Sequence, residues 1–296
     1  MGIRFDKEPQ LEEPILIAGW PGIGNVGLMA VDSLRGMVRA EQFAEIEPWD
    51  FFYPTAVSIR GGELKDLGFP ANKFYFKRVN QKDLIFFVGE EQPGKAEENY
   101  EMANLVLDLA MRFGCNRVYT AAAAVTQVHH TMKPMVWAVP NSKKLIGEVE
   151  RYDNVILMSV IEEKGRQGNI TGLNGLLVGV ARKRGLDGIC LLGEIPLYVS
   201  QLPISYPKAS KSILEVLASS LGIRIDLGRL DSLAENVELE IERIYQKLPP
   251  EIRERIDQLK YVSRVEHAEA ERITEEDKKR IIQDIEEFFK RGGREH

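Results

Sequence analysis

One stretch sets the architecture expected for this chain: Pro14-Ile15-Leu16-Ile17-Ala18-Gly19-Trp20-Pro21-Gly22-Ile23-Gly24-Asn25-Val26-Gly27. It begins with the short apolar run 15–18, which is typical of a buried strand. Gly22, Gly24 and Gly27 follow in the spacing G-x-G-x-x-G, and a helical pattern then runs from about 24 to 37. This spacing permits a tight turn and close packing of a helix on a strand. The stretch therefore predicts a strand–turn–helix unit with free backbone N–H groups at the helix start.

The size and charge of the chain limit its class. It has 296 residues, ordinary apolar content and a formal net charge of −6. This length fits one large α/β domain with an appendage, or two domains. The acidic balance argues against a nucleic-acid partner, which would require a basic face. No apolar run reaches the roughly 18 residues that span a bilayer, and the charged residues near the start are unlike a signal peptide. We therefore expect a cytoplasmic protein without a membrane partner.

The cysteines and histidines give no sign of a metal or a disulfide framework. Cys115 and Cys190 are the two cysteines of the chain and fit a reducing compartment. Cys190 lies in the apolar run 189–192, so we expect it to be buried and inert. His129 and His130 are adjacent, and neighbouring residues of an extended segment point to opposite sides. We therefore expect neither a metal site nor a cofactor.

Apolar runs typical of strands alternate with helical patterns as far as about position 224. Strands are expected at 43–47, 55–60, 74–76, 83–88, 117–125, 136–139, 155–159 and 189–192, and helices at about 100–114, 173–184 and 207–221. Asn80-Gln81-Lys82 is expected to be a hairpin turn, so this part of the sheet would be antiparallel or mixed. The alternation predicts an α/β sandwich with a largely parallel sheet.

Composition changes near Ile225, beyond which charged residues dominate and no strand pattern appears. A narrow apolar stripe runs to about 248, where Pro249-Pro250 ends the helix, and a short helix follows around 252–259. A third helix is expected after Thr274, which with Asp277 is typical of a helix cap. The candidate partner-binding residues of this arm are Leu233, Val237, Ile281, Ile285, Phe288 and Phe289. We therefore divide the chain into an α/β domain, 1–224, which we expect to fold alone, and a C-terminal helical extension, 225–296. The stripe would cover the body, a second subunit or a partner.

Titratable side chains follow three of the expected strands, namely Glu90, His129 and Glu194. Because the carboxyl ends of parallel strands converge on a crevice, we expect these groups to meet there. The candidate ligand-binding crevice comprises Gly22, Gly24, Asn25, Gly27, Glu90, His129, Asn174 and Glu194. A histidine beside carboxylates would serve as a general base or hold a phosphate. The alternative is that the two glutamates only cap loops or pair with cations.

The glycine motif itself has three interpretations: a dinucleotide site, a site for another anion or small ligand, and a turn with a structural role only. Glu47 lies twenty residues beyond Gly27, which is the position of the ribose-binding acid in dinucleotide-binding folds. The interpretation that we favour is a tight turn with close packing and no ligand. The chain has no G-x-S-x-G nucleophile elbow and no Walker lysine, so we assign no catalytic residue and expect no enzyme.

Several stretches together resemble the proteasome assembly chaperone 2 (PAC2) family, in its archaeal and bacterial branch. They are residues 19–27, 88–93, 122–134, 168–177 and 191–198, and they cover roughly residues 10–222. Their order and spacing are specific, although no single stretch is. The resemblance implies a three-layer α/β/α sandwich of the phosphorylase/hydrolase-like kind, which is commonly homo-oligomeric and has no established catalytic residues.

The same resemblance implies a non-enzymatic, oligomeric chaperone-like or scaffold protein with proteasome subunits or another protein as partner. Eukaryotic members act as ATP-independent chaperones in assembly of the proteasome core. Some archaeal relatives bind the proteasome through a final hydrophobic-Tyr-X segment, where this sequence reads Arg294-Glu295-His296. The alternative function is a binding protein or enzyme for a nucleoside or a phosphate-bearing ligand, which would use the crevice at the strand carboxyl ends.

Overall fold

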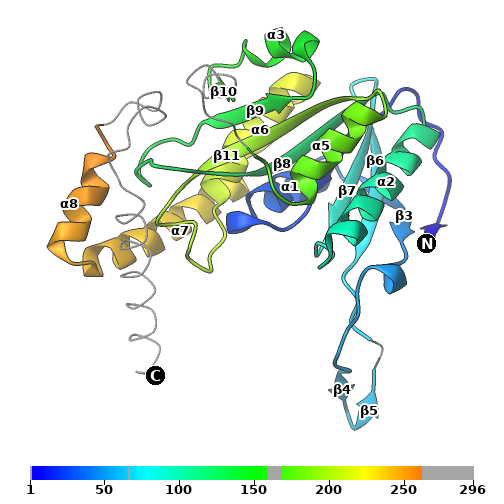
Figure 1. Ribbon diagram of the computed structural model, residues 1–296, viewed down its shortest axis with the longest axis horizontal. Helices are drawn as coiled ribbons and strands as arrows, with labels where there is room; N and C mark the ends of the chain where they lie inside the picture. Colours follow the sequence, from blue (N-terminus) through cyan, green and yellow to red (C-terminus); the bar gives the residue numbers. More distant parts are fainter. Residues whose placement is uncertain (1, 66, 159–168, 262–296) are drawn as a thin grey trace.

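A nine-stranded mixed sheet forms the centre of the molecule, in the order β1-β3-β6-β7-β2-β8-β11-β9-β10 (Figure 1). The computed structural model describes residues 2–65, 67–158 and 169–261. The strands of the sheet are β1 (Ile3–Phe5), β2 (Ile15–Gly19), β3 (Glu41–Ile46), β6 (Asn72–Val79), β7 (Lys82–Gly89), β8 (Arg117–Thr126), β9 (Val136–Pro140), β10 (Val155–Leu157) and β11 (Asp187–Pro196).

The centre of the sheet is parallel and its flanks are mixed. β2 lies between β7 and β8, with Ile15 opposite Leu84 and Arg117, and β8 is parallel to β11. β6 and β7 form an antiparallel hairpin. Asn80 and Gln81 at its turn have φ values of 48° and 63°, as the two central residues of a type I′ hairpin turn require. The predicted hairpin and the predicted mixed sheet are both confirmed.

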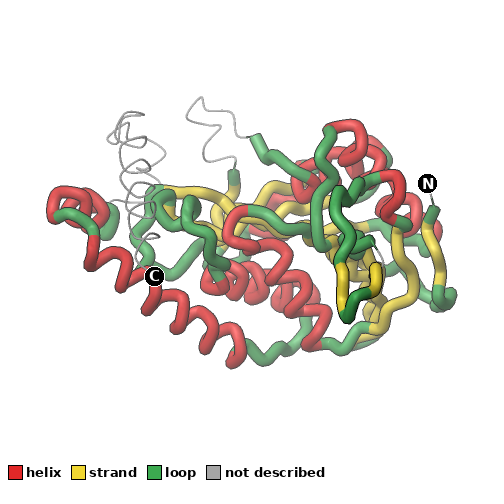
Figure 2. Tube along the Cα trace, turned by 90° about the horizontal axis from the view of Figure 1, so that it is seen from below, coloured by secondary structure: helices red, strands yellow, loops and turns green. Residues whose placement is uncertain are grey.

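Helices cover both faces of the sheet, as Figure 2 shows. They are α1 (Val26–Met37), α6 (Pro207–Leu221) and α7 (Gly228–Lys247) on one side, and α2 (Ala96–Arg112) and α5 (Leu173–Lys183) on the other, with α3 (Ile146–Val149) and α8 (Pro250–Gln258) at the periphery. Alternation along β2 supplies both cores, because Ile17 packs with the first group whereas Leu16 and Ala18 pack with the second. The three-layer α/β/α sandwich is confirmed. Within the described residues, no helix has the length and apolar content needed to cross a bilayer.

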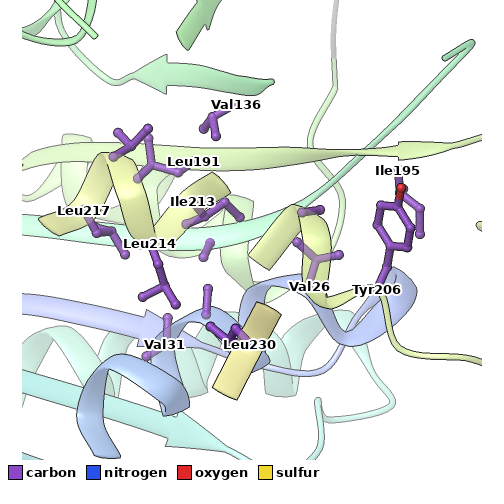
Figure 3. Packing of buried hydrophobic residues seen from close by; sticks show 14 of the residues in the cluster. Val26, Val31, Val136, Leu191, Ile195, Tyr206, Ile213, Leu214, Leu217 and Leu230 are labelled. Atoms are coloured by element: carbon purple, nitrogen blue, oxygen red, sulfur yellow. The ribbon is translucent and has the colours of Figure 1, made fainter. Parts of the chain in front are cut away.

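The beginning of the C-terminal extension belongs to the same hydrophobic core as the sheet. Leu230 and Ile241 of α7 and Ile256 of α8 are each 2% exposed or less, and all three lie in one cluster with α1 and α6. Figure 3 shows Leu230 on the same side of the sheet as Val31 and Leu214. Of the three covers expected for the apolar stripe, namely the body, a second subunit or a partner, the described part of α7 has the first. It packs on α6, whose buried apolar side chains lie in the same cluster.

A small hairpin projects from the body between β3 and β6 (Figure 1). It consists of β4 (Ile59–Arg60) and β5 (Glu63–Leu64), which is much less strand than the predicted run 55–60. Gly61 and Gly62 close the turn with φ values of 65° and 83°. Ile59 and Leu64 face each other across the hairpin and are 70% and 73% exposed. These apolar side chains therefore have no cover within the described part of the chain.

Candidate functional site

The glycine-rich turn joins β2 to α1 through the short helix η1 (Ile23–Asn25). Gly24 has a φ of 58°, in the left-handed region that favours glycine, and its carbonyl accepts a hydrogen bond from the Tyr206 N–H at 2.8 Å. A Cβ atom on Gly27 would lie 1.9 Å from the Ala121 carbonyl oxygen. These two glycines therefore allow the turn and the close approach of α1 to β8. A Cβ on Gly22 would meet nothing within 4 Å.

A cavity of about 390 Å³ lies beside this turn, between β8 and the residues that lead into α5. Gly22, Gly27 and Asn174 line it, together with Trp20 and residues 122–126. Its volume falls in the range of about 300–1,000 Å³ that is usual for small-ligand sites. Among the described residues that line it, none has an ionisable side chain. The cavity thus offers a phosphate no side-chain cation from the described part of the chain.

Two amide side chains in the cavity wall fasten the turn to α5. Asn174 accepts a hydrogen bond from the Trp20 N–H at 3.2 Å and donates one to the Trp20 carbonyl at 3.5 Å. Gln92 donates to the Pro21 carbonyl at 2.6 Å and accepts from the Leu173 N–H at 2.9 Å. Gln92 is absent from the predicted site, although it lies in one of the stretches that carry the family resemblance. Both amides therefore already have backbone partners in the cavity wall.

Glu90, Glu194 and Asn25 lie outside this cavity. Glu90 is exposed and accepts a hydrogen bond from the Ala71 N–H at 2.8 Å. Glu194 is 1% exposed and accepts from the Met135 N–H at 2.9 Å and from the Trp137 indole at 3.2 Å. Asn25 donates to the Ser205 hydroxyl at 3.3 Å. This cavity therefore does not bring Glu90, His129 and Glu194 together, and the N–H donors of the two glutamates come from neighbouring segments of the sheet.

His129 and His130 lie instead beneath α7 and α8, each 2% exposed. The Nδ1 atom of His129 accepts a hydrogen bond from the Thr131 N–H at 3.2 Å, and its Nε2 atom lies 3.6 Å from the Asp257 carboxylate. His130 contacts Tyr198 through Nδ1 at 2.7 Å and Glu242 of α7 through Nε2 at 3.2 Å. The pair therefore joins the loop after β8 to the C-terminal helices.

Burial keeps both histidines neutral at pH 7. It is the largest cause that lowers the pKa of His129 from 6.5 to about 4, followed by the electrostatic effects of the neighbouring His130 and Lys260. Burial likewise lowers the pKa of His130, against the opposing effect of Glu242. A neutral imidazole under a helix, away from the cavity, does not match the predicted general base in the crevice. Within the described residues, no group of three or more His, Cys, Asp or Glu side chains is placed to hold a metal ion.

Two of the predicted partner-binding residues are described. Leu233 is 41% exposed and lines a second groove, of about 790 Å³, between α1 and the start of α7. Val237, one turn further along α7, is half-buried against the core. Arg35, Arg39, Arg224 and Arg229 line the groove with Asp32 and Asp226, which makes it basic. Ile281, Ile285, Phe288 and Phe289 lie outside the described residues.

The strand order removes the dinucleotide interpretation of the glycine motif. Glu47 directly follows β3, and β6 and β7 separate β3 from β2. In the dinucleotide-binding fold, the ribose-binding acid follows the strand next to the glycine-rich turn. Here the neighbours of β2 are β7 and β8, so Glu47 is too far across the sheet for that role.

The fold and the turn define a three-layer α/β/α protein in which C-terminal helices cover the loop after β8. The model of the PAC2 family matches residues 16–245, and the chain belongs to that family. The match continues past position 224 into α7, as the shared core does. A protein of Methanocaldococcus jannaschii is 30% identical over 240 residues, which are 81% of this chain and 85% of that protein.

Solved structures agree with this assignment. Pyrococcus furiosus PbaB, described as an archaeal proteasome activator, is 29% identical with a TM-score of 0.69, and the match covers 82% of this chain and 98% of PbaB. A proteasome-assembly chaperone homologue of Mycobacterium tuberculosis has the same fold at 18% identity, with a TM-score of 0.66 and coverage of 83% and 99%.

Proposed function

We propose that the protein is a homo-oligomeric, non-enzymatic chaperone of the cytoplasm that binds proteasome subunits. The observation that carries this proposal is the similarity to PbaB, a protein described as a proteasome activator, over 98% of the length of that chain. Membership of the PAC2 family supports the same class of function.

The chemistry of the cavity supports the non-enzymatic part of the proposal. General acid–base or nucleophilic catalysis requires titratable or nucleophilic groups in contact with the substrate. The described lining offers indole, amide, thioether, hydroxyl and aliphatic groups but no ionisable side chain that could activate a hydroxyl as a base. Glu90, Glu194 and His129 lie elsewhere, where each accepts a hydrogen bond from a backbone N–H group. Large apolar side chains on the projecting hairpin, such as Ile59 and Leu64, support association with another subunit or partner.

Native mass spectrometry of the full-length protein tests the proposal. The protein would be measured alone, with separately purified proteasome α and β subunits, and with the assembled core particle of its host. We expect a homo-oligomer in the first sample and a complex in at least one of the others. A monomer that forms no complex with subunits or core particle would overturn the proposal. A parallel assay of peptide hydrolysis by the core particle distinguishes an activator, which raises the rate, from an assembly factor, which does not.

A further inference from the structure

One strand of the sheet, β8, has an edge that lacks a strand neighbour over part of its length. β8 continues for six residues, 121–126, beyond the end of its pairing with β2. β2 is paired as far as Ala18 opposite Thr120, whereas β11 remains paired on the other side as far as Pro196 opposite Thr126. Within the described part of the chain, residues 121–126 thus have a strand neighbour on one side only. Gly27 of α1 lies against the Ala121 backbone, so the open part of this edge is 123–126. The cavity lies at this open side, because residues 122–126 form part of its lining.

The direction of the backbone groups follows from the ladder on the paired side. The carbonyls of Asn116 and Thr126 accept hydrogen bonds from the N–H groups of Asp187 and Leu197, at and beside β11. Successive residues of a strand turn their N–H and C=O groups to opposite sides. Ala123 and Val125, at odd positions, therefore direct these groups away from β11 and toward the cavity side. No backbone group of a described residue bonds to them there.

The residues that line the cavity favour an uncharged, apolar ligand. Trp20, Trp137, Met158, Ile170 and Leu192 supply apolar surface, and no described lining residue is ionisable. The hydroxyl oxygen of Thr126 is buried and has no hydrogen-bond partner among the described residues. A charged group would lose its hydration here without a compensating charge, which is unfavourable. An extended peptide could instead form hydrogen bonds with the N–H and C=O groups of Ala123 and Val125, which are spaced as in a β-strand.

We propose that this cavity binds an extended, uncharged and apolar polypeptide segment of a partner protein, which adds to β8 along residues 123–126 as a further strand. Main-chain hydrogen bonds to Ala123 and Val125 would supply affinity, and pockets for alternate side chains would supply specificity. The side chains of Ala122 and Ala124 face the Trp137–Leu192 side, so every second residue of the segment would point to that side. The inference goes beyond the proposed function, because it specifies the chemistry of a binding site whatever protein supplies the segment.

A peptide-binding assay on the full-length protein tests the site. The probe is a short peptide of alternating valine and threonine around a central phenylalanine, blocked at both ends and labelled for fluorescence anisotropy. We expect binding, and a change in tryptophan emission, since Trp20 and Trp137 line the cavity. Replacing the central phenylalanine by lysine or glutamate, or methylating the peptide N–H groups that face β8, would weaken binding by about tenfold or more.

Matched variants locate the binding. Ala124→Leu places a larger side chain in the cavity and should weaken binding of the parent peptide by about tenfold. Ala124→Ser leaves the cavity volume nearly unchanged, so its dissociation constant for the same peptide should stay within about twofold of the unsubstituted protein. Equal effects of the two substitutions, tight binding of the N-methylated peptide, or no binding of the parent peptide would overturn the proposal. If Ala124→Leu fails to fold in a thermal-unfolding control, the N-methylated peptide with the unmodified protein decides. No proteasome subunit takes part in this assay, so its outcome is independent of the test of the proposed function.

Discussion

Gly27 is the residue at which the glycine motif contributes most directly to packing. A Cβ atom there would lie 1.9 Å from the Ala121 carbonyl oxygen, which belongs to rigid backbone. We expect Gly27→Ala to lower the free energy of unfolding by about 1–3 kcal/mol or more, the usual cost of overpacking. Gly22→Ala is the matched control, because its φ of −166° is open to any residue and it has no neighbour within 4 Å. Urea unfolding of both variants measures the difference, and equal midpoints would contradict this account of the motif.

His129 makes the stability of the protein depend on pH. In the unfolded chain it gains a proton near pH 6.5, but in the folded protein only near pH 4. The free energy of unfolding is therefore not reduced by His129 well above pH 6.5. It falls as the pH drops from about 6.5 toward 4, because in this range the unfolded state binds more protons than the folded state. The charged groups that act on the pair are carboxylates and cations of the C-terminal segment, namely Asp257, Lys260, Glu242 and Glu238, together with Lys208 of α6.

We expect His129→Phe, which keeps a ring beside His130, to reduce this acid sensitivity. The unfolding temperature of both proteins would be measured at about pH 7.5 and about pH 5. The variant should lose less stability between the two conditions, even if it is less stable at the higher pH through loss of the Thr131 hydrogen bond. Equal losses would show that His129 does not cause the dependence.

Helix α7 has two exposed leucines that allow a paired test of its contribution to partner binding. Leu233, 41% exposed, lines the basic groove beside α1, whereas Leu239, 59% exposed, lies six positions along the helix and outside that groove. We expect Leu233→Glu to weaken binding of proteasome subunits by about tenfold, because a charge would replace an apolar contact and lose its hydration in the complex, and Leu239→Glu to have little effect. Neither change should alter stability by more than about 0.5 kcal/mol, because both side chains are exposed. Equal behaviour of the two variants in native mass spectrometry would exclude the groove.

The elements differ in how far the sequence determines them. Helix α6 has the predicted bounds, 207–221, because Pro207 begins it and Gly222, with a φ of 67°, ends it. β1 is absent from the prediction, since three residues with one exposed arginine carry no strand pattern. The predicted site residues also differ in outcome. The cavity brings together Gly22, Gly27 and Asn174, but not Glu194. The convergence of strand ends predicts where the backbone lies. It does not predict which N–H groups will form hydrogen bonds with a carboxylate.

At the scale of the whole molecule, the question is how much α7 and α8 contribute to the stability of the sheet domain. An apolar stripe in sequence does not reveal whether it covers its own body or a partner. Here it covers the body, with Leu230, Ile241, Tyr245, Leu248, Ile252, Ile256 and Leu259 each no more than 8% exposed. Fully burying one such side chain contributes about 1.5–3 kcal/mol, and the lost entropy of the ordered helices offsets a large part of the total.

We expect residues 1–224 alone to form the sheet, since the central strands and α1, α2, α5 and α6 remain, but to unfold at a lower temperature than the full chain and to bind a hydrophobic dye along α6. Circular dichroism during heating measures the transition. In the full chain, Ile241→Ala should cost about 2–5 kcal/mol in a single transition, because Ile241 is 2% exposed within the shared core. If the truncated chain unfolds at the temperature of the full chain and Ile241→Ala has no effect, the helices are a separate unit. If the truncated chain does not fold, α7 and α8 are as essential to the core as α6. The boundary at 224 would then lie within a single domain.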